Sequence, residues 1–280
     1  MGFRINTNLD SIVGVNNLSR TNSRLSGNFG RLSSGLRINK AADDAAGLAV
    51  SESLRAQIRG LGQAIRNTND GVSIIQTAEG ALNQIQNNLA RLRELAVQSA
   101  SGTLGDADRA YINTESTALL AEIDRLANVT DFNGQVLLNG STATGTGTIT
   151  VDVQVGIQNS TNDRITVQVS SARSQALGVN TVNLSSSTLS QSALVSIDLA
   201  ISRVSNTRSL LGATQNRLGS ALNNLQISVE SLSSAESQIR DVDFAQETAQ
   251  LSRNQILQQA GVSVLSQANS SSQAVLNLIR

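Results

Sequence analysis

The side chains that carry most enzyme chemistry are missing from this sequence of 280 residues. It contains no histidine, cysteine, proline or tryptophan, and Lys40 is its single lysine. A Ser-His-Asp triad, a Cys-His pair, a thiolate cluster and a histidine metal site all need residues that are absent. The composition therefore predicts that the chain is not an enzyme, binds no cofactor, and has no catalytic or metal site.

Charge and hydropathy argue against two further classes of partner. Lysine and arginine together number 21 and so do aspartate and glutamate, and only five residues are aromatic. The basic, aromatic footprint of a nucleic-acid binder is absent. No run of eighteen apolar residues could span a membrane, and the start, MGFRINTNLD, lacks the apolar core of a secretory signal. We expect neither a nucleic acid nor a membrane as partner.

Two long stretches repeat apolar residues in steps of three and four, as amphipathic helices do. One runs from Leu54 to Leu95 and the other from Leu194 to Ile239. Neither could bury its apolar stripe alone, so we expect the two helices to pair. A third helix is indicated up to Leu126, with Gly102 as the stop before it and Thr103 as its cap.

The middle of the chain, residues 136–188, changes to a period of two. Apolar residues alternate with polar ones over 149–157 and again over 165–169, and the six residues QNSTND between these runs predict a hairpin loop. Asn-Gly pairs at 133–134 and 139–140 are turn signals.

The predicted fold class is mainly α: a long antiparallel helical rod or coiled-coil bundle with a small β-hairpin unit in the middle of the chain. We expect a terminal helical domain from residues 1–40 plus 241–280, mobile in the monomer. A helical rod domain would comprise 41–135 plus 189–240, and residues 136–188 would form the outer β unit.

Several segments closely resemble bacterial flagellins. They are RLSSGLRINKAADDAAGLAVSESLRAQIRGL from residue 31, RNTNDGVSIIQTAEGALNQIQNNLARLRELAVQSASGT from residue 66, SAESQIRDVDFAQETAQLSRNQILQQAGVSVLSQAN from residue 234, and the terminal VLNLIR. The resemblance covers about residues 1–135 and 189–280, and the β middle matches in position and type only.

This resemblance implies a secreted, extracellular building block of the bacterial flagellum that supports motility. Such a subunit is exported unfolded by the flagellar type III apparatus and polymerises under a cap at the distal tip. The implied partners are other copies of the chain in a helical filament, a flagellar export chaperone, the cap protein and a host toll-like receptor. The short middle corresponds to a minimal variable region.

Contact surfaces are the working parts of such a subunit. The two ends hold more apolar length than two helices can hide from water, which favours contacts between copies over packing within one chain. The candidate subunit-packing residues are Leu9, Leu25, Phe29, Leu32, Leu36, Leu257, Leu265, Leu276 and Ile279.

Two other groups of residues are candidates. Asn39, Asp43 and Asp44 favour caps and turns, so residues 38–47 are the expected connector between terminal helix and rod. By resemblance, Arg91, Leu95 and Glu115 match the family's immune-receptor motif, although Ala90 replaces the usual glutamine. Packing along a helix face is the alternative for Arg91 and Leu95.

Two alternatives to a filament subunit stay open. A hook-filament junction protein shares the terminal helices, although its rod motifs usually diverge from the segments quoted. A surface adhesin or carbohydrate-binding filament protein belongs to a different class, and the middle has few aromatic residues to stack on sugars. The zinc protease of some flagellins needs an HExxH motif, which is absent here.

Overall fold

The computed structural model describes residues 7–140 and 146–278, and side chains as far as residue 271. It divides into two compact units, one of Met1–Ile58 with Ser231–Arg280 and one of Arg59–Glu230. The helices are α1 (Leu9–Ser34), α2 (Ala45–Ala100), α3 (Asp106–Val129), α4 (Ser174–Leu177), α5 (Ser187–Arg240) and α6 (Phe244–Leu278). The strands are β1 (Asp131–Phe132), β2 (Gln135–Val136), β3 (Thr148–Gln154) and β4 (Arg164–Ser170). The predicted fold class, mainly α with a small β unit in the middle, is confirmed.

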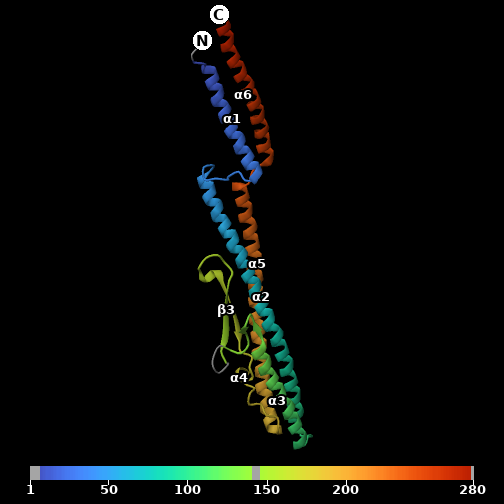
Figure 1. Cartoon of the computed structure of the whole chain (residues 1–280). Helices are drawn as coiled ribbons and strands as arrows, with labels where there is room; N and C mark the ends of the chain where they lie inside the picture. The colour runs from blue at the N-terminus through green and yellow to red at the C-terminus, as the bar shows by residue number, and fades with distance from the viewer. Residues whose placement is uncertain (1–6, 141–145, 279–280) are drawn as a thin grey trace. The chain divides into compact units, whose positions relative to one another are not determined.

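The core of the unit Arg59–Glu230 lies between α2, α3 and α5, which run side by side in Figure 1. The stripe that the sequence placed on α2 is buried from Ile75 to Leu95, and its counterpart on α5 is buried at most positions from Ile197 to Leu225, whereas the outer members of both stripes are mostly half-buried. The residues with no more than 2% exposure include Ile75, Leu82, Ile85, Leu89, Leu92, Ile123, Ile197, Val204, Leu211 and Leu218. At about 1.5–3 kcal/mol for each large apolar side chain removed from water, this core is the main stabilising feature of the unit.

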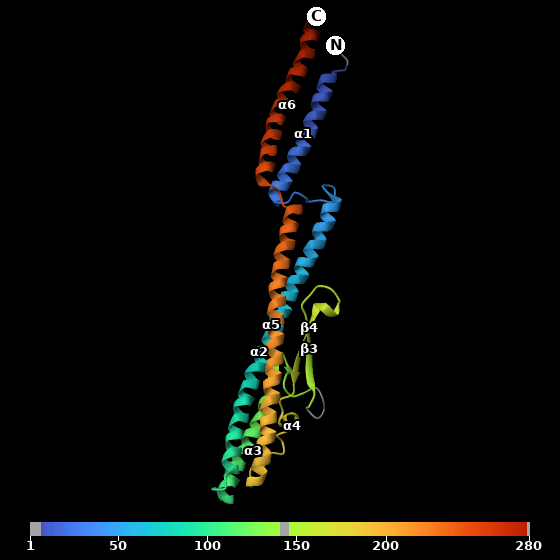
Figure 2. The ribbon, with the colours of Figure 1, turned by 180° about the vertical axis from the view of Figure 1, so that it is seen from behind.

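The hairpin β3–β4 adds its apolar face to the same core. Val151 is opposite Val167 in the antiparallel register, and Ile149 and Val153 face Val169 and Ile165. Viewed from behind, the hairpin lies alongside α2 and α5 (Figure 2). Within β3 and β4, the alternating pattern in the sequence correctly predicted which side chains turn inward.

Glycine permits the close approach of β3 to α2. A Cβ on Gly71 would lie 2.9 Å from Val153 Cγ2 and 3.3 Å from Leu218 Cδ1. An alanine at this position would therefore force the Val153 side chain to shift. The turn between β1 and β2 also needs special backbone geometry, because Asn133 and Gly134 have φ values of 51° and 80°. The Asn-Gly signal therefore marks a real two-residue hairpin.

Two local predictions were wrong. The cap of α3 is Gly105 rather than Thr103, whose hydroxyl bonds with the Ser101 hydroxyl at 2.8 Å instead. The hairpin loop spans nine residues, 155–163, because β3 stops at Gln154 and the loop folds into a 3-10 turn at Thr161–Asp163. Apolar alternation continues to Ile157, but exposed Ile157 is outside the ladder.

A buried arginine closes the end of α2. Arg109 Nε donates to the Ser99 carbonyl at 3.0 Å, and its Nη2 donates to the Ser101 carbonyl at 2.8 Å. Ser99 is in the last turn of α2, where carbonyls have no intrahelical partner, and Ser101 directly follows the helix. Arg109 also forms an ion pair with Asp106 at 3.1 Å, so it joins the end of α2 to the start of α3.

Among the described residues, no helix combines the length and apolar character needed to cross a membrane.

Candidate assembly interface

Helices α1 and α6 form an antiparallel pair, and they lie side by side in Figure 1. Asn8 Nδ2 donates to the Ala268 carbonyl at 3.1 Å near one end of the pair. In the middle, Gln258 Nε2 donates to Asn22 Oδ1 at 2.8 Å, and at the other end Arg31 Nη1 is 3.9 Å from a carboxylate oxygen of Glu247. As residue numbers rise along α1, those of the partners on α6 fall.

The seam between α1 and α6 consists mostly of polar and small residues. The buried and half-buried positions recur in alternating steps of three and four, which is the heptad spacing of a coiled coil. On α1 they are Ser11, Gly14, Leu18, Thr21, Leu25, Asn28 and Leu32, and on α6 they are Glu247, Leu251, Asn254, Gln258, Gly261, Leu265 and Ala268. Of these, only Asn28, Glu247 and Asn254 are fully buried.

Many large apolar side chains of the pair face away from this seam. Ile256 is 66% exposed and Val264 is 63% exposed. The other exposed members on the described parts of the two helices are Leu9, Ile12, Val13, Val15, Phe29, Phe244, Leu257 and Val262. Exposed apolar surface on this scale, next to a seam that buries so little, marks a site of contact with another molecule.

The predicted packing residues separate into two sets. Leu9, Phe29 and Leu257 are exposed and point outward, whereas the others that the structure describes are half-buried. The half-buried residues are Leu25, Leu32 and Leu265 in the seam, and Leu36, which pairs with Asp241 in an isolated bridge. The side chain of Leu276 and all of Ile279 lie outside the described residues.

The list from the sequence omitted several outward residues, including Ile256, Val264 and Val15. Ile256 and Val264 are visible in the sequence as apolar residues. Apolar periodicity by itself does not distinguish a seam within the chain from an outer face. The glycines and asparagines at heptad spacing on α1 and α6 were the signal that could have located the true seam.

The predicted connector residues Asn39, Asp43 and Asp44 lie in the non-helical segment 35–44, whereas residues 45–47 of the predicted range 38–47 belong to the first turn of α2. Asp43 Oδ2 accepts from the backbone N–H groups of Asn39 and Lys40 at 3.2 and 3.0 Å. Asp44 Oδ1 accepts from the Gly47 N–H at 2.9 Å and so caps the start of α2. The two backbone bonds, from Lys40 and then from Asn39, hold the pKa of Asp43 below its ordinary value.

The connector is also tied to the segment that follows α5. The Arg37 N–H donates to the Arg240 carbonyl at 2.7 Å, and the Val242 N–H donates to the Gly35 carbonyl at 3.0 Å. Glu52 accepts from Arg240 Nη1 at 2.8 Å and pairs with Arg55 at 3.0 Å. Its pKa is lowered, chiefly by the hydrogen bond from Arg240.

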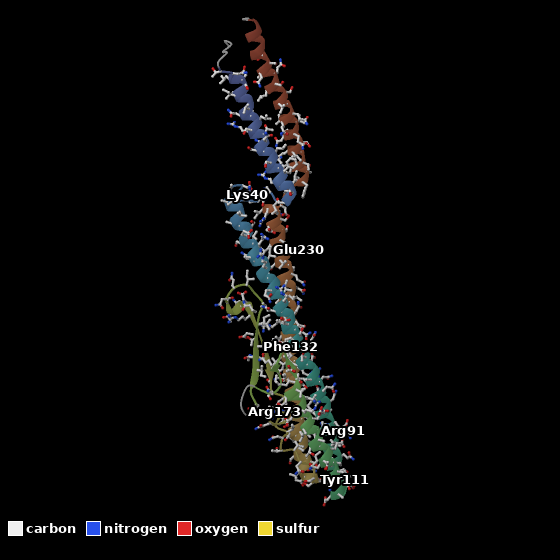
Figure 3. All side chains as sticks on the ribbon, viewed as in Figure 1. Lys40, Arg91, Tyr111, Phe132, Arg173 and Glu230 are labelled. Carbon is white, nitrogen blue, oxygen red and sulfur yellow. The ribbon has the colours of Figure 1, made fainter. Side chains whose placement is uncertain are left out.

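The three receptor-motif residues do not share one environment. Arg91 Nη1 pairs with Glu94 at 3.0 Å and its Nη2 pairs with Glu115 at 2.9 Å, on an exposed surface of α2 and α3. These two carboxylates, Glu94 first, raise the pKa of Arg91. Leu95 is 2% exposed and belongs to the core. In Figure 3, Arg91 and Tyr111 lie toward the same end of this unit.

Comparison with known proteins matches nearly the whole chain. The model of the bacterial flagellin N-terminal helical region matches residues 5–143, and that of the bacterial flagellin C-terminal helical region matches 194–279. The flagellar filament 33 kDa core protein of Treponema phagedenis is 42% identical over 99% of both chains. Flagellin of Bacillus subtilis (strain 168) is 43% identical over 99% of this chain and 100% of its own.

Among solved structures, the crystal structure of Bacillus cereus flagellin is similar, with 32% sequence identity and a TM-score of 0.49. The match covers 57% of this chain and 88% of that chain. The family matches at both ends, together with identity above 40% over nearly the full length of these relatives, are sufficient to assign the family. The chain belongs to the bacterial flagellin family.

Proposed function

We propose that the chain is a structural subunit of the bacterial flagellar filament, and that copies contact one another through the outward faces of α1 and α6. The observation that carries this proposal is the set of exposed apolar side chains on a helix pair whose own seam is largely polar and small. The names of the relatives, flagellin and flagellar filament core protein, support the filament assignment.

The energetics of the pair favour association. Full burial of an isoleucine or valine contributes about 1.5–3 kcal/mol relative to full exposure. Ile256 and Val264 keep nearly two thirds of their surface in water, so most of that contribution is available only when another copy covers them. A contact between two different faces of identical copies generates a closed ring if the rotation closes and an open helical filament if it does not. The names of the relatives favour the filament.

Export and location are finer parts of the proposal. The subunit would leave the cell unfolded through the flagellar type III apparatus with an export chaperone, polymerise beneath the cap protein, and support motility outside the cell. A chain without cysteine forms no disulfide that would have to open before threading. No chemical step is needed, because the proposed activity is assembly.

Seeded polymerisation tests the assignment of the contacts. Short filament fragments are mixed with the 280-residue chain, with a variant lacking residues 1–40, and with Arg125→Ser as a surface control on α3. We expect elongation by the chain and by the control, and none by the deletion variant, which should remain helical by circular dichroism. Elongation by the deletion variant at the normal rate would refute the role of α1.

Recognition by a toll-like receptor is a separate proposal. It rests on the exposed Arg91 and Glu115, which the resemblance assigns to the receptor motif and which pair at 2.9 Å. Leu95 would contribute only by packing beneath them. In a receptor-reporter assay on dissolved chain, Arg91→Asp should lower signalling, whereas Arg125→Asp, at another exposed arginine paired with glutamate, should not. Unchanged signalling by Arg91→Asp would remove the proposal.

A further inference from the structure

The seam between α1 and α6 contains two glycines, and each has a leucine of the other helix against it. A Cβ on Gly14 would lie 3.2 Å from Leu265 Cδ1, and a Cβ on Gly261 would lie 3.4 Å from Leu18 Cδ1. The two contacts are reciprocal, because α1 supplies the glycine in the first and the leucine in the second. They are successive layers of the same heptad pattern.

Toward the connector, the seam contains three buried polar side chains among half-buried leucines and polar residues. The Asn28 amide, oriented to satisfy both neighbours, donates to the Arg24 carbonyl and accepts from the Leu251 N–H at 3.3 Å. Glu247 is buried with Arg31 as its ionic partner at 3.9 Å, and Asn254 is buried on the same face of α6. A polar residue in a coiled-coil seam fixes register at a cost in stability.

We propose that the reciprocal glycine–leucine layers and buried Asn28 specify the register of α1 against α6. The pair has few large apolar seam residues, so apolar burial alone discriminates poorly between registers that differ by one heptad. A slide of one heptad, about 10 Å along the helices, would move Gly261 from Leu18 to Ser11 and leave space there. A slide of one heptad in the opposite direction would remove the contact of Gly14 with Leu265 and the hydrogen bond between Asn28 and Leu251.

This register determines the outer surface of the pair. The exposed apolar residues of α1 and α6 hold fixed axial positions relative to one another only if the two helices keep one register. The inference deepens the proposed function, because copies can repeat a contact only when each presents the same surface. The register inference is based on the geometry of the seam, whereas the proposed function is based on the exposed apolar surface. One can therefore be wrong while the other is right.

An exchange of residue sizes tests the inference. The variant Gly261→Leu places two leucines against each other, and the double variant Leu18→Gly/Gly261→Leu restores one leucine and one glycine with their helices exchanged. Gly27→Leu is the matched control: it adds the same side chain, also at a helical glycine, where a Cβ would meet nothing within 4 Å.

Spin labels report the register directly, because the chain has no cysteine of its own. Cysteines at the exposed positions Ser33 and Ser266 carry the labels, and pulsed electron resonance measures the distance between them in filaments diluted with unlabelled chain. The parent and Gly27→Leu should give the same single distance. Gly261→Leu should shift it by about 10 Å or lose assembly, and the double variant should restore both.

Two results would overturn the inference. One is a Gly261→Leu variant that assembles like the parent at the parent distance, and the other is a double variant that restores neither distance nor assembly. If the parent chain enters no filament, the proposed function fails instead. The same label distances, measured on the dissolved chains, then decide the register by themselves.

Discussion

Replacing Ile256 by serine should weaken assembly while leaving the dissolved chain folded. The side chain is 66% exposed, so its removal costs the single chain little packing. Isoleucine and serine have similar helix propensities, and α6 should remain helical. The loss should therefore be confined to the contact between copies.

The size of the effect follows from the surface that remains to be buried. Full burial of an isoleucine contributes about 1.5–3 kcal/mol. Two thirds of the Ile256 surface remains to be buried on assembly, so its loss should weaken the free energy of adding one subunit by about 1–2 kcal/mol. Each 1.4 kcal/mol is a factor of about ten in an equilibrium constant. The critical concentration for elongation should rise about 5- to 30-fold.

The assay is elongation of short filament fragments at a series of chain concentrations, followed by light scattering, with circular dichroism of the dissolved chain as a folding check. Gln259→Ser is the matched control, since it is an exposed polar position on the same helix. An unchanged critical concentration for Ile256→Ser would refute the reasoning that this face is covered in the filament. An equal rise for Gln259→Ser would show that the effect is not specific to apolar surface.

Three further outcomes follow from the structure. Leu92→Ala, at a fully buried position, should lower the free energy of unfolding in urea by about 2–5 kcal/mol, and a smaller loss than for exposed Val97→Ala would contradict the core assignment. Arg109→Ala should cost about 1.5–3 kcal/mol and speed amide hydrogen exchange in the last turn of α2, whereas unchanged exchange would exclude the cap. Asp43, with its lowered pKa, should stabilise the connector above about pH 4 and lose this effect as the pH falls through the folded pKa. Slow hydrogen exchange at the Lys40 amide should show the same pH dependence, and it should be lost in Asp43→Ala, which has no acceptor oxygen. Exchange at Lys40 that depends on neither the pH nor this substitution would contradict the prediction.

The apolar pattern located the buried core of the unit Arg59–Glu230 because the apolar residues there face partners in the same chain. Leu82 and Leu92 follow heptad spacing and are buried against other helices, so periodicity and burial agree. The alternation of Val151 and Val167 likewise matched their inward positions in the hairpin. The start of α3 was harder to predict, because several residues near Thr103 could serve as its N-cap. Which of them does so depends on the path of the backbone between α2 and α3, and the sequence does not specify that path.

The terminal pair was harder to predict for a physical reason. Apolar periodicity identifies a helix face that is buried away from water. It does not indicate whether that face packs against the same chain or against another copy. Leu25 and Phe29 carry the same signal in the sequence, yet Leu25 is half-buried in the seam and Phe29 is exposed. Only the contacts of small residues, such as Gly14 against Leu265, distinguish the two faces.

The most direct test of the assembly interface is a helical reconstruction, by electron cryomicroscopy, of filaments grown from this chain. We expect α1 and α6 of each copy to contact neighbouring copies, with Ile256 and Val264 buried between them. A filament in which both side chains remain open to solvent, with copies joined only through residues 59–230, would contradict the account.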